Sequence, residues 1–467
     1  MSSLPTSGLQ PPASIHFLGI CGTAMGAVAA AMRDSGYVVS GQDDNVYPPM
    51  STFLESKGIK ITRGFLAEDI PAADVIVIGN AMSRGNPAVE AVLERKLYYL
   101  SLPETLKQFF LRGRHNLVVT GTHGKTTTTS LLAWIFESAG RSPSYLIGGI
   151  PANLGQGACL RESKHFVIEG DEYDTAFFDK RSKFIHYLPE LVIVNNIEFD
   201  HADIYRDLEE IKTTFRRLLN IVPGNGMVLL NADDPNCVDV AQKCPAPIVE
   251  VGFTENAGNH IRNPRQEHGI SYFELFGATF EVPLVGDFNI RNAAMAASAA
   301  HFYGISVPEI QKALATFKGI KRRQEVRGEV RGITVIDDFG HHPTAIRETL
   351  AALRERYAGA RLWAVFEPRS NTTRRAVFQH ELPRAFADAH GVFIAQVARL
   401  DQLPPDERLD PERVVADLAA SGKPAFYEPT ADSIVAKLAP LAQSGDVVIV
   451  FSNGGFDGIH QKLLEQL

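Results

Sequence analysis

The 467-residue chain is too long for one hydrophobic core, and its length alone predicts two to four domains. Hydrophobic residues make up 45% of it and charged residues 21%, which is the composition of an ordinary soluble protein. The formal net charge of −8 argues against a nucleic-acid partner. The basic stretch at 318–331 is the one local exception, and it is either a solvated linker or a phosphate-facing segment.

The first residues carry no recognisable targeting signal. Residues 1–14 lack the basic and apolar regions of a signal peptide, and no apolar run in the chain reaches the length of a membrane span. The four cysteines form no Cys-x-x-Cys pair and no zinc-binding spacing, which is typical of reduced thiols. We therefore expect a cytoplasmic protein without a membrane partner and with a disordered tail over residues 1–14.

Residues 15–111 are predicted to alternate between strands and helices. Apolar runs at 15–20, 37–44 and 74–80 have the length of buried strands, and the alanine-rich segment after the first run is typical of a helix. This alternation predicts a parallel sheet whose ligand lies at the carboxyl ends of the strands.

The turn after the first strand, GICGTAMG, begins at Gly19, and Asp43 follows about 20 residues later, as in dinucleotide-binding turns. Cys21 and Ala24 stand where that fingerprint has glycine, so the backbone would approach a pyrophosphate less closely. Three interpretations stay open: a turn that only packs helix on strand, an NAD site, or a site for another diphosphate such as a UDP-sugar.

A second unit spans residues 112–322 and opens on VVTGTHGKTTTTS, at 118–130. The general phosphate-loop pattern has its first glycine five residues before the second, but here that position is Val119 and the nearest earlier glycine is Gly121. A strand precedes the turn and a threonine-rich helix follows it, so backbone N–H groups at the helix start would bind phosphate. Lys125 would reach the β- and γ-phosphates of a nucleotide, and the Thr126 hydroxyl would bind Mg²⁺.

Two further strands of this unit end in acidic clusters, HFVIEGDEYD at 165–174 and NNIEFDHADIY at 195–205. An isolated carboxylate at a strand end is more often solvated, but two such clusters beside a phosphate loop favour a metal site. His201 is a further candidate ligand, although imidazole is not the usual choice of Mg²⁺.

Four more strands are expected after the basic stretch, within the segments 333–343, 361–370, 391–397 and 446–455. Each apolar run ends in a polar or glycine-rich turn. The predicted fold is thus an α/β protein of three domains: a Rossmann-like domain at 15–111, a P-loop ATPase domain at 112–322 and a second Rossmann-like domain at 323–467.

Motifs in all three segments resemble those of the Mur ligases, the ATP-dependent amide-forming ligases of peptidoglycan synthesis. The motifs are GTHGKTTTT, the acidic cluster at Glu169, NNIEFDHADIY, GDFNIRNAAMAA at 286–297, KRRQE and DDFGHHP. The short phosphate loop of this family, G-T-x-G-K-T, has its first glycine where Gly121 stands. The resemblance implies that ATP and Mg²⁺ are required.

Two kinds of Mur ligase share these motifs. One adds L-alanine to UDP-N-acetylmuramate, and the other adds the recycled murein tripeptide L-alanyl-γ-D-glutamyl-meso-diaminopimelate. The segments at 43–52, 366–372 and 452–464 resemble the second kind, whereas the first has a Q-P-H-R-Y-type stretch where 367–371 lie and tyrosine where Phe339 lies. We therefore expect UDP-N-acetylmuramate and the tripeptide as substrates, with the alanine ligase as the alternative.

Two positions depart from the family pattern. Phe288 stands where G-x-H-N has histidine, so a nucleotide contact by that imidazole is missing. Arg216 stands about where several Mur ligases have a carbamylated lysine, with Lys212 one turn earlier, so no carbamyl-lysine is expected.

The resemblance implies that the lactyl carboxylate of the sugar attacks the γ-phosphorus of ATP, and that the peptide amine then displaces phosphate. Lys125, Glu169 and His201 would serve this reaction, with Thr126 and Glu169 at one metal ion and His201 at another. For Asp338 and His342, the alternatives to a ligand role are a helix cap and a packed histidine. For Arg369 and Arg374, the alternative to peptide binding is a solvated surface side chain. The other implied ligands are Gly121, Thr122, His123, Gly124, Thr127, Asn292, Arg323, Asp338 and His342 for ATP; Gly19, Cys21, Gly22, Thr23, Met25, Asp43, Asn80 and Asn86 for the UDP-sugar; and Arg369, Asn371 and Arg374 for the peptide.

Other classes of function fit less of the chain. An NAD-dependent oxidoreductase would rest on the first glycine turn and leave the phosphate loop unexplained. A non-catalytic nucleotide-binding regulator would have no need of Lys125, Thr126, Glu169 and His201 together. We expect the three domains to close during the reaction, since an acyl phosphate must be shielded from water, and we expect a monomer or a weak homodimer.

Overall fold

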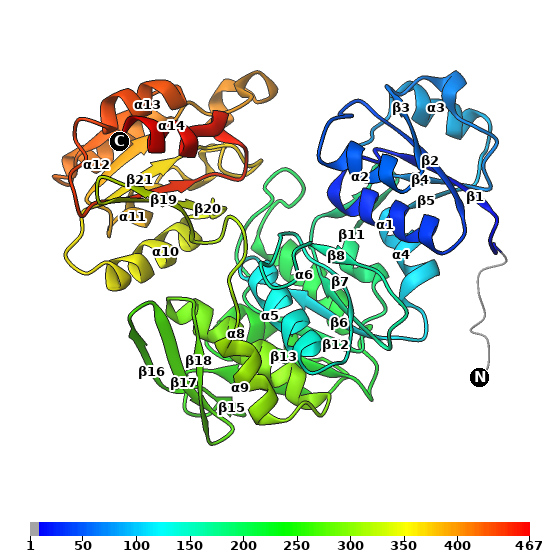
Figure 1. Cartoon of the computed structure of the whole chain (residues 1–467), viewed down its shortest axis with the longest axis horizontal. Helices are drawn as coiled ribbons and strands as arrows, with labels where there is room; N and C mark the ends of the chain where they lie inside the picture. The colour runs from blue at the N-terminus through cyan, green and yellow to red at the C-terminus, as the bar shows by residue number, and fades with distance from the viewer. Residues whose placement is uncertain (1–8) are drawn as a thin grey trace.

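The computed structural model describes residues 9–467, which form three α/β domains (Figure 1). In this view the blue N-terminal domain and the orange-to-red C-terminal domain lie side by side above the central domain. The central strands are apolar on both faces because helices cover both sides of each sheet: all four residues of β4 (Val75–Ile78) are buried. Within residues 9–467, no helix has both the length and the apolar composition needed to cross a membrane.

The N-terminal sheet has five parallel strands in the order β3-β2-β1-β4-β5. Since β1 lies between β2 and β4, the turns that follow β1 and β4 open at the same sheet edge. Leu9 packs against this domain, and its carbonyl accepts a hydrogen bond from the Tyr37 hydroxyl at 3.3 Å. The expected disordered tail is therefore wrong for residues 9–14, and residues 1–8 lie outside the described part. The elements are β1 (Ser14–Leu18), α1 (Thr23–Asp34), β2 (Val38–Asp43), α2 (Met50–Ser56), β3 (Lys60–Arg63), β4, α3 (Pro87–Glu94), β5 (Tyr99–Ser101) and α4 (Leu102–Leu106).

The central sheet has eight strands in the order β15-β14-β13-β12-β6-β9-β7-β8. The strand before the phosphate loop, β6, lies between β9 and β12, so both acidic clusters start at the edge where the loop begins. A β10–β11 hairpin and an antiparallel sheet of β16, β17 and β18 are additions that the sequence analysis does not predict. The elements are β6 (His115–Thr120), α5 (Lys125–Ser138), β7 (Ser144–Leu146), β8 (Ala158–Cys159), β9 (His165–Glu169), β10 (Asp174–Ala176), β11 (Asp179–Ser182), β12 (Leu191–Val194), α6 (Leu208–Leu219), β13 (Met227–Asn231), α7 (Pro235–Ala241), β14 (Ile248–Gly252), β15 (Asn259–His260), β16 (Arg262–Glu267), β17 (Ile270–Leu275), β18 (Ala278–Val282), α8 (Asp287–Phe302) and α9 (Val307–Ala315).

The C-terminal sheet has six strands in the order β19-β20-β24-β21-β22-β23. Only the β19–β20 pair is antiparallel, so the carboxyl ends of β20, β21 and β24 meet at one edge. The turns that follow these strands carry the DDFGHHP, FEPRSNT and SNGG segments. The elements are β19 (Glu325–Val330), β20 (Ile333–Asp338), α10 (Pro343–Arg356), β21 (Leu362–Phe366), α11 (Leu382–Ala385), β22 (Gly391–Ile394), α12 (Pro411–Ala420), β23 (Ala425–Tyr427), α13 (Ala431–Leu438), β24 (Val447–Phe451) and α14 (Ile459–Gln466).

Candidate active site

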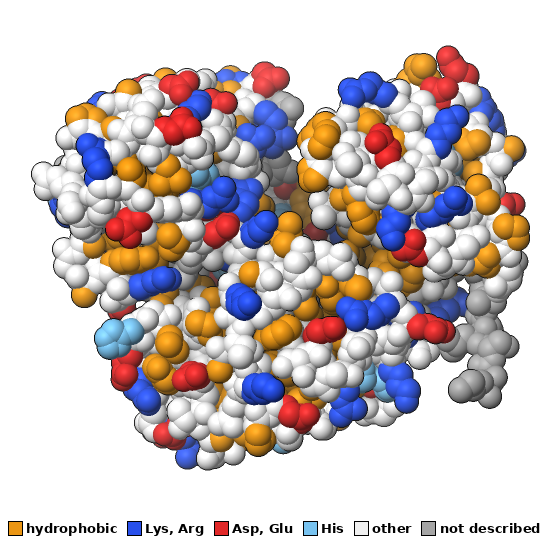
Figure 2. Space-filling model, in the orientation of Figure 1, with side chains coloured by type: hydrophobic (Ala, Val, Ile, Leu, Met, Phe, Trp, Pro, Cys, Tyr) orange, Lys and Arg blue, Asp and Glu red, His pale blue; other side chains and the backbone are white. Residues whose placement is uncertain are grey.

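A cavity of about 950 Å³ is lined by residues of all three domains. Figure 2 shows a deep notch between the two outer domains, above the central one. Gly22 contributes from the N-terminal domain, Lys125 from the central domain and Asp338 from the C-terminal domain. The cavity is therefore complete only when the three domains are together.

The phosphate loop joins β6 to the start of α5. Gly124 precedes the helix with a left-handed φ of +78°, and a Cβ built on it would lie 2.5 Å from the Asn292 side-chain oxygen, so only glycine fits there. No side chain caps α5, which leaves the N–H groups of its first turn available to a phosphate. The Lys125 ammonium curls back over the loop and donates to the Gly121 carbonyl at 2.6 Å. Thr122, His123, Gly124, Lys125, Thr126 and Thr127 all line the cavity, whereas Gly121 does not.

Lys125 lies at the centre of a buried set of charges. Its ammonium is 2.9 Å from the Glu172 carboxylate, and the exposed fractions of the two side chains are 14% and 3%. Burial disfavours the charged ammonium, but Glu172, Asp171 and Glu169 outweigh burial and raise the pKa of Lys125. The phosphate loop therefore holds a buried lysine cation at the start of α5.

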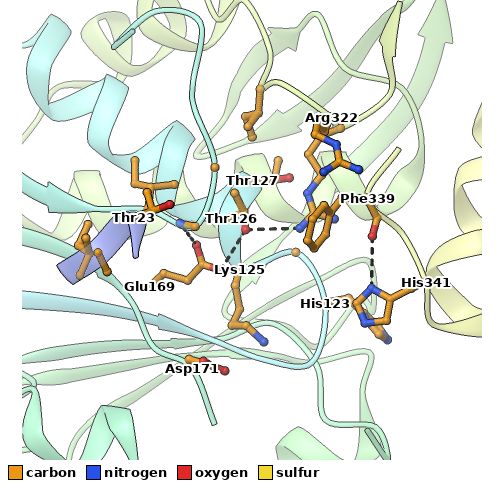
Figure 3. Close-up of a pocket in the computed structure, with 18 of the residues that line it drawn as sticks. Thr23, His123, Lys125, Thr126, Thr127, Glu169, Asp171, Arg322, Phe339 and His341 are labelled. Carbon is orange, nitrogen blue, oxygen red and sulfur yellow. Dashed lines mark hydrogen bonds between the residues drawn. The ribbon is translucent and has the colours of Figure 1, made fainter. Parts of the chain in front are cut away.

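Thr126 and Glu169 form a pair of oxygen donors beside the loop (Figure 3). The Thr126 hydroxyl donates to Glu169 Oε1 at 3.0 Å, and the Gly148 backbone N–H donates to Glu169 Oε2 at 2.7 Å. A hydroxyl and a carboxylate next to a phosphate loop are the donors that Mg²⁺ prefers, so this pair fits the predicted metal ion.

His201 contacts Glu172, the carboxylate that also pairs with Lys125. Its Nε2 is 3.2 Å from Glu172 Oε1, and ligand atoms of Asp171, Glu172 and His201 lie within 4.8 Å of one another. Burial lowers the pKa of His201, but the bond to Glu172 and the nearby carboxylates outweigh it and raise that pKa to about 9. In this arrangement His201 is a cation, and it would bind a metal only after losing a proton.

The C-terminal domain enters the site through His342 and Asp338. His342 Nδ1 accepts a hydrogen bond from the Thr344 N–H at 3.2 Å and so caps α10, while its Nε2 donates to the Phe199 carbonyl of the central domain at 3.2 Å. Burial and the charge of His123 lower the pKa of His342 to about 3. His342, and not Asp338, therefore caps helix α10. The Asp338 carboxylate instead accepts from the Gln324 and Gly340 N–H groups, at 2.9 and 2.7 Å.

The basic linker before β19 faces the cavity. The guanidinium groups of Arg322 and Arg323 lie 5.1 and 5.2 Å from the centre of the Phe339 ring. Arg323 also reaches the Thr126 hydroxyl at 3.5 Å. Of the two alternatives for this stretch, the phosphate-facing one fits the position of Arg323, and Asn292 and Phe288 line the same cavity. Arg322, which the sequence analysis does not single out, holds the Ser452 and Gly454 carbonyls at 2.7 Å.

The N-terminal domain presents only part of its predicted set to the cavity. Gly19, Gly22, Thr23, Met25 and Asn80 line it, whereas Cys21, Asp43 and Asn86 are not among the lining residues. The Asp43 carboxylate accepts the Cys21 N–H at 2.8 Å and so stabilises the glycine turn. The Asn86 side chain caps α3. The structure thus gives Asp43 and Asn86 structural roles, and their contacts with a UDP-sugar stay predictions.

The three residues predicted for the peptide do not line the cavity, and each of them has a partner inside the protein. The Asn371 amide donates to Asp203 of the central domain at 2.8 Å and accepts from Arg374 at 2.8 Å. Arg374 is buried and also donates to the Arg399 carbonyl at 3.1 Å. Arg369 is more exposed and contacts Glu367 at 3.3 Å. As direct peptide ligands, Asn371 and Arg374 are therefore not supported by the structure.

Some polar residues of the site are not singled out by the sequence analysis. Asn195, directly after β12, donates to the Thr128 hydroxyl at 3.0 Å, and Thr128 donates to Asn292 at 3.1 Å. Tyr173 and Thr372 join the central and C-terminal domains. The polar Asn-Asn pair after an apolar run was a usable signal for Asn195, whereas Thr372 has no local signal because its partner is 172 residues away.

Comparisons with known proteins match three parts of the chain to one family. Residues 14–114 match the Mur ligase family catalytic domain, residues 119–300 the Mur ligase middle domain, and residues 322–454 the Mur ligase glutamate ligase domain. The chain is a Mur ligase. Its predicted family, its three-domain α/β fold and its assignment as a ligase are thereby confirmed.

Similar proteins include ligases named for the tripeptide and ligases named for L-alanine. This Mur ligase is 46% identical over 458 residues to the UDP-N-acetylmuramate–L-alanyl-γ-D-glutamyl-meso-2,6-diaminoheptandioate ligase of Haemophilus influenzae, covering 97% of this chain and 99% of the relative. The crystal structure of a murein peptide ligase from Psychrobacter arcticus has a TM-score of 0.73 and 38% identity, covering 97% and 98% of the two chains. The UDP-N-acetylmuramate–L-alanine ligase of Syntrophus aciditrophicus is 32% identical, covering 97% and 93%.

Proposed function

We propose that this Mur ligase joins L-alanyl-γ-D-glutamyl-meso-diaminopimelate to UDP-N-acetylmuramate at the expense of ATP. The observation that carries the proposal is the single cavity to which the glycine turn, the phosphate loop and the turn after β20 all contribute. A sugar nucleotide, ATP and an acceptor can meet there. The 46% identity to a ligase named for this tripeptide, against 32% to one named for L-alanine, supports the choice of acceptor.

ATP would bind with its phosphates over the start of α5. The N–H groups of the first turn and the Lys125 ammonium would neutralise the phosphates, and Asn292 and Arg323 line the same cavity. Thr126 and Glu169 would hold Mg²⁺, which supplies charge neutralisation at the phosphates. Gly19, Gly22 and Thr23 would receive the diphosphate of the UDP-sugar.

The sugar carboxylate would attack the γ-phosphorus of ATP, and ADP would leave. Since the substrate carboxylate is the nucleophile, this chain needs no nucleophilic side chain, and its contribution is positioning and charge stabilisation. Lys125 would follow the transferred phosphoryl group, since its ammonium already lies over the loop. The acceptor amine would then attack the acyl phosphate, release phosphate and form the amide.

The test is a set of parallel reactions with ATP, Mg²⁺ and UDP-N-acetylmuramate in which the acceptor is the tripeptide, L-alanine or buffer. Phosphate release and product mass are both recorded. We expect phosphate release, and a product whose mass has increased by that of the tripeptide, only in the reaction that contains the tripeptide. An alanine adduct alone would make the chain an alanine-adding ligase and refute the acceptor assignment.

A further inference from the structure

We propose that the turn at 370–374 is an interdomain latch that positions His201 for the reaction, with Thr372 as the positioning residue. The proposal rests on the proposed function and assigns to this turn a role other than direct binding of the peptide. The turn follows β21 and belongs to the C-terminal domain. Its side chains donate hydrogen bonds to two carboxylates of the loop at 200–203 in the central domain, Asp200 and Asp203.

The first point of contact is a buried hydrogen bond from Thr372 to Asp200. The Thr372 hydroxyl donates to Asp200 Oδ1 at 2.5 Å, and the exposed fractions of the two residues are 1% and 5%. The same Oδ1 accepts the backbone N–H of His201 at 2.7 Å. One oxygen of Asp200 therefore ties the C-terminal domain to the backbone of His201.

His201 needs such support because its backbone is unusual. Its φ is +54°, a left-handed conformation that costs a non-glycine residue roughly 1 kcal/mol or more. Its carbonyl accepts the N–H groups of Ile204 and Tyr205, which closes a tight turn. The Asp200 carboxylate stabilises the start of this turn by accepting the His201 N–H. Without the Thr372 hydroxyl, Asp200 would lose the hydrogen bond that orients its carboxylate.

The second point of contact is Asp203, whose carboxylate accepts hydrogen bonds from both Tyr173 and Asn371. Tyr173 donates its hydroxyl to Asp203, and the Asn371 amide donates to the same carboxylate oxygen at 2.8 Å. Tyr173 follows Glu172, the residue that pairs with Lys125 and with His201. Both arms of the latch thus lead to the charges around the phosphate loop.

The turn itself is stabilised separately from the latch. Ser370 accepts the Thr373 N–H at 3.0 Å, the Thr373 hydroxyl lies 2.8 Å from the Ser370 hydroxyl, and Arg374 N–H donates to the Ser370 carbonyl at 3.1 Å. Thr373 is fully buried but is hydrogen-bonded only within the turn. Thr372 and Thr373 are therefore a matched pair, since only the first reaches across the domain interface.

The test compares Thr372→Val with Thr373→Val in the full-length protein. Only Thr372→Val removes a hydrogen bond to a charged group, the Asp200 carboxylate. We expect kcat of this variant to fall roughly 10- to 100-fold. The affinity for UDP-N-acetylmuramate, measured by calorimetry, is unchanged because that substrate binds the N-terminal domain. Thr372→Ser restores kcat, and Thr373→Val stays within about two-fold of the wild type in kcat.

Hydrogen–deuterium exchange at residues 200–205 gives a second readout that does not depend on turnover. Exchange there is faster in Thr372→Val and in Asn371→Ala than in Thr373→Val. Equal exchange and equal kcat in the two valine variants would overturn the latch, even with a fully active wild type. A wild type inactive with the tripeptide would instead refute the proposed function, while the exchange comparison would still decide the latch.

Discussion

The buried pair of Lys125 and Glu172 provides a stability prediction that is separate from catalysis. Removing one partner of a buried ion pair leaves an uncompensated charge and costs roughly 3–5 kcal/mol. In Lys125→Met, the Glu172 carboxylate still has His201 at 3.2 Å, so we expect a loss near the lower limit, about 3 kcal/mol. The double variant Lys125→Met with Glu172→Gln removes both charges and recovers most of that loss.

The assay is urea denaturation followed by tryptophan fluorescence. The chain has two tryptophans, and Trp134 lies in α5, in the same helix as Lys125, so a Trp363→Phe background makes the signal report on the central domain. We expect the midpoint to fall in Lys125→Met and to return toward wild type in the double variant. Unfolding free energies that simply add in the double variant would refute the buried-pair interpretation.

Three further predictions address the loop, the metal donors and the N-terminal core. Gly124→Ala places a Cβ 2.5 Å from the Asn292 oxygen at a left-handed φ, so we expect ATP affinity to fall at least ten-fold, as measured by calorimetry. Glu169→Gln weakens the donor pair with Thr126, and we expect the Mg²⁺ concentration for half-maximal activity to rise about ten-fold, whereas an unchanged value would exclude Glu169 from the metal site. Burial lowers the pKa of His16 to about 4 in the folded state. In the unfolded chain the imidazole has a pKa of about 6.5, so between these two pH values it is protonated only when the chain is unfolded. Its contribution to the unfolding free energy therefore falls by about 1.4 kcal/mol between pH 7.5 and 5.5, and His16→Gln removes that part of the pH dependence.

The sequence predicts those parts of the site that lie at strand ends. Lys125, Thr126 and Glu169 meet because β6 and β9 are parallel neighbours, and parallel strands bring their carboxyl ends to one sheet edge. An apolar run followed by polar residues can be recognised from the sequence alone, and this pattern predicts the acidic clusters and the glycine turns.

The parts that the sequence does not predict depend on pairings between distant segments. The antiparallel sheet of β16–β18 is partly exposed and rich in charged residues, so it lacks the apolar runs that mark the central strands. Asn371 and Arg374 resemble peptide ligands in sequence, yet their partners are internal, and only the packing of the C-terminal domain on the loop at 200–203 decides this. Asp43 illustrates the same point within one domain, since its carboxylate is used by the turn that it follows.

A competition between the two acceptors in one reaction decides which of them this Mur ligase uses. The protein is given ATP, Mg²⁺, UDP-N-acetylmuramate and equal concentrations of L-alanine and L-alanyl-γ-D-glutamyl-meso-diaminopimelate, and the two products are quantified by mass spectrometry at early times. We expect the tripeptide adduct in large excess, with one ADP and one phosphate formed for each molecule of adduct. A product mixture dominated by the alanine adduct would refute the tripeptide as the acceptor.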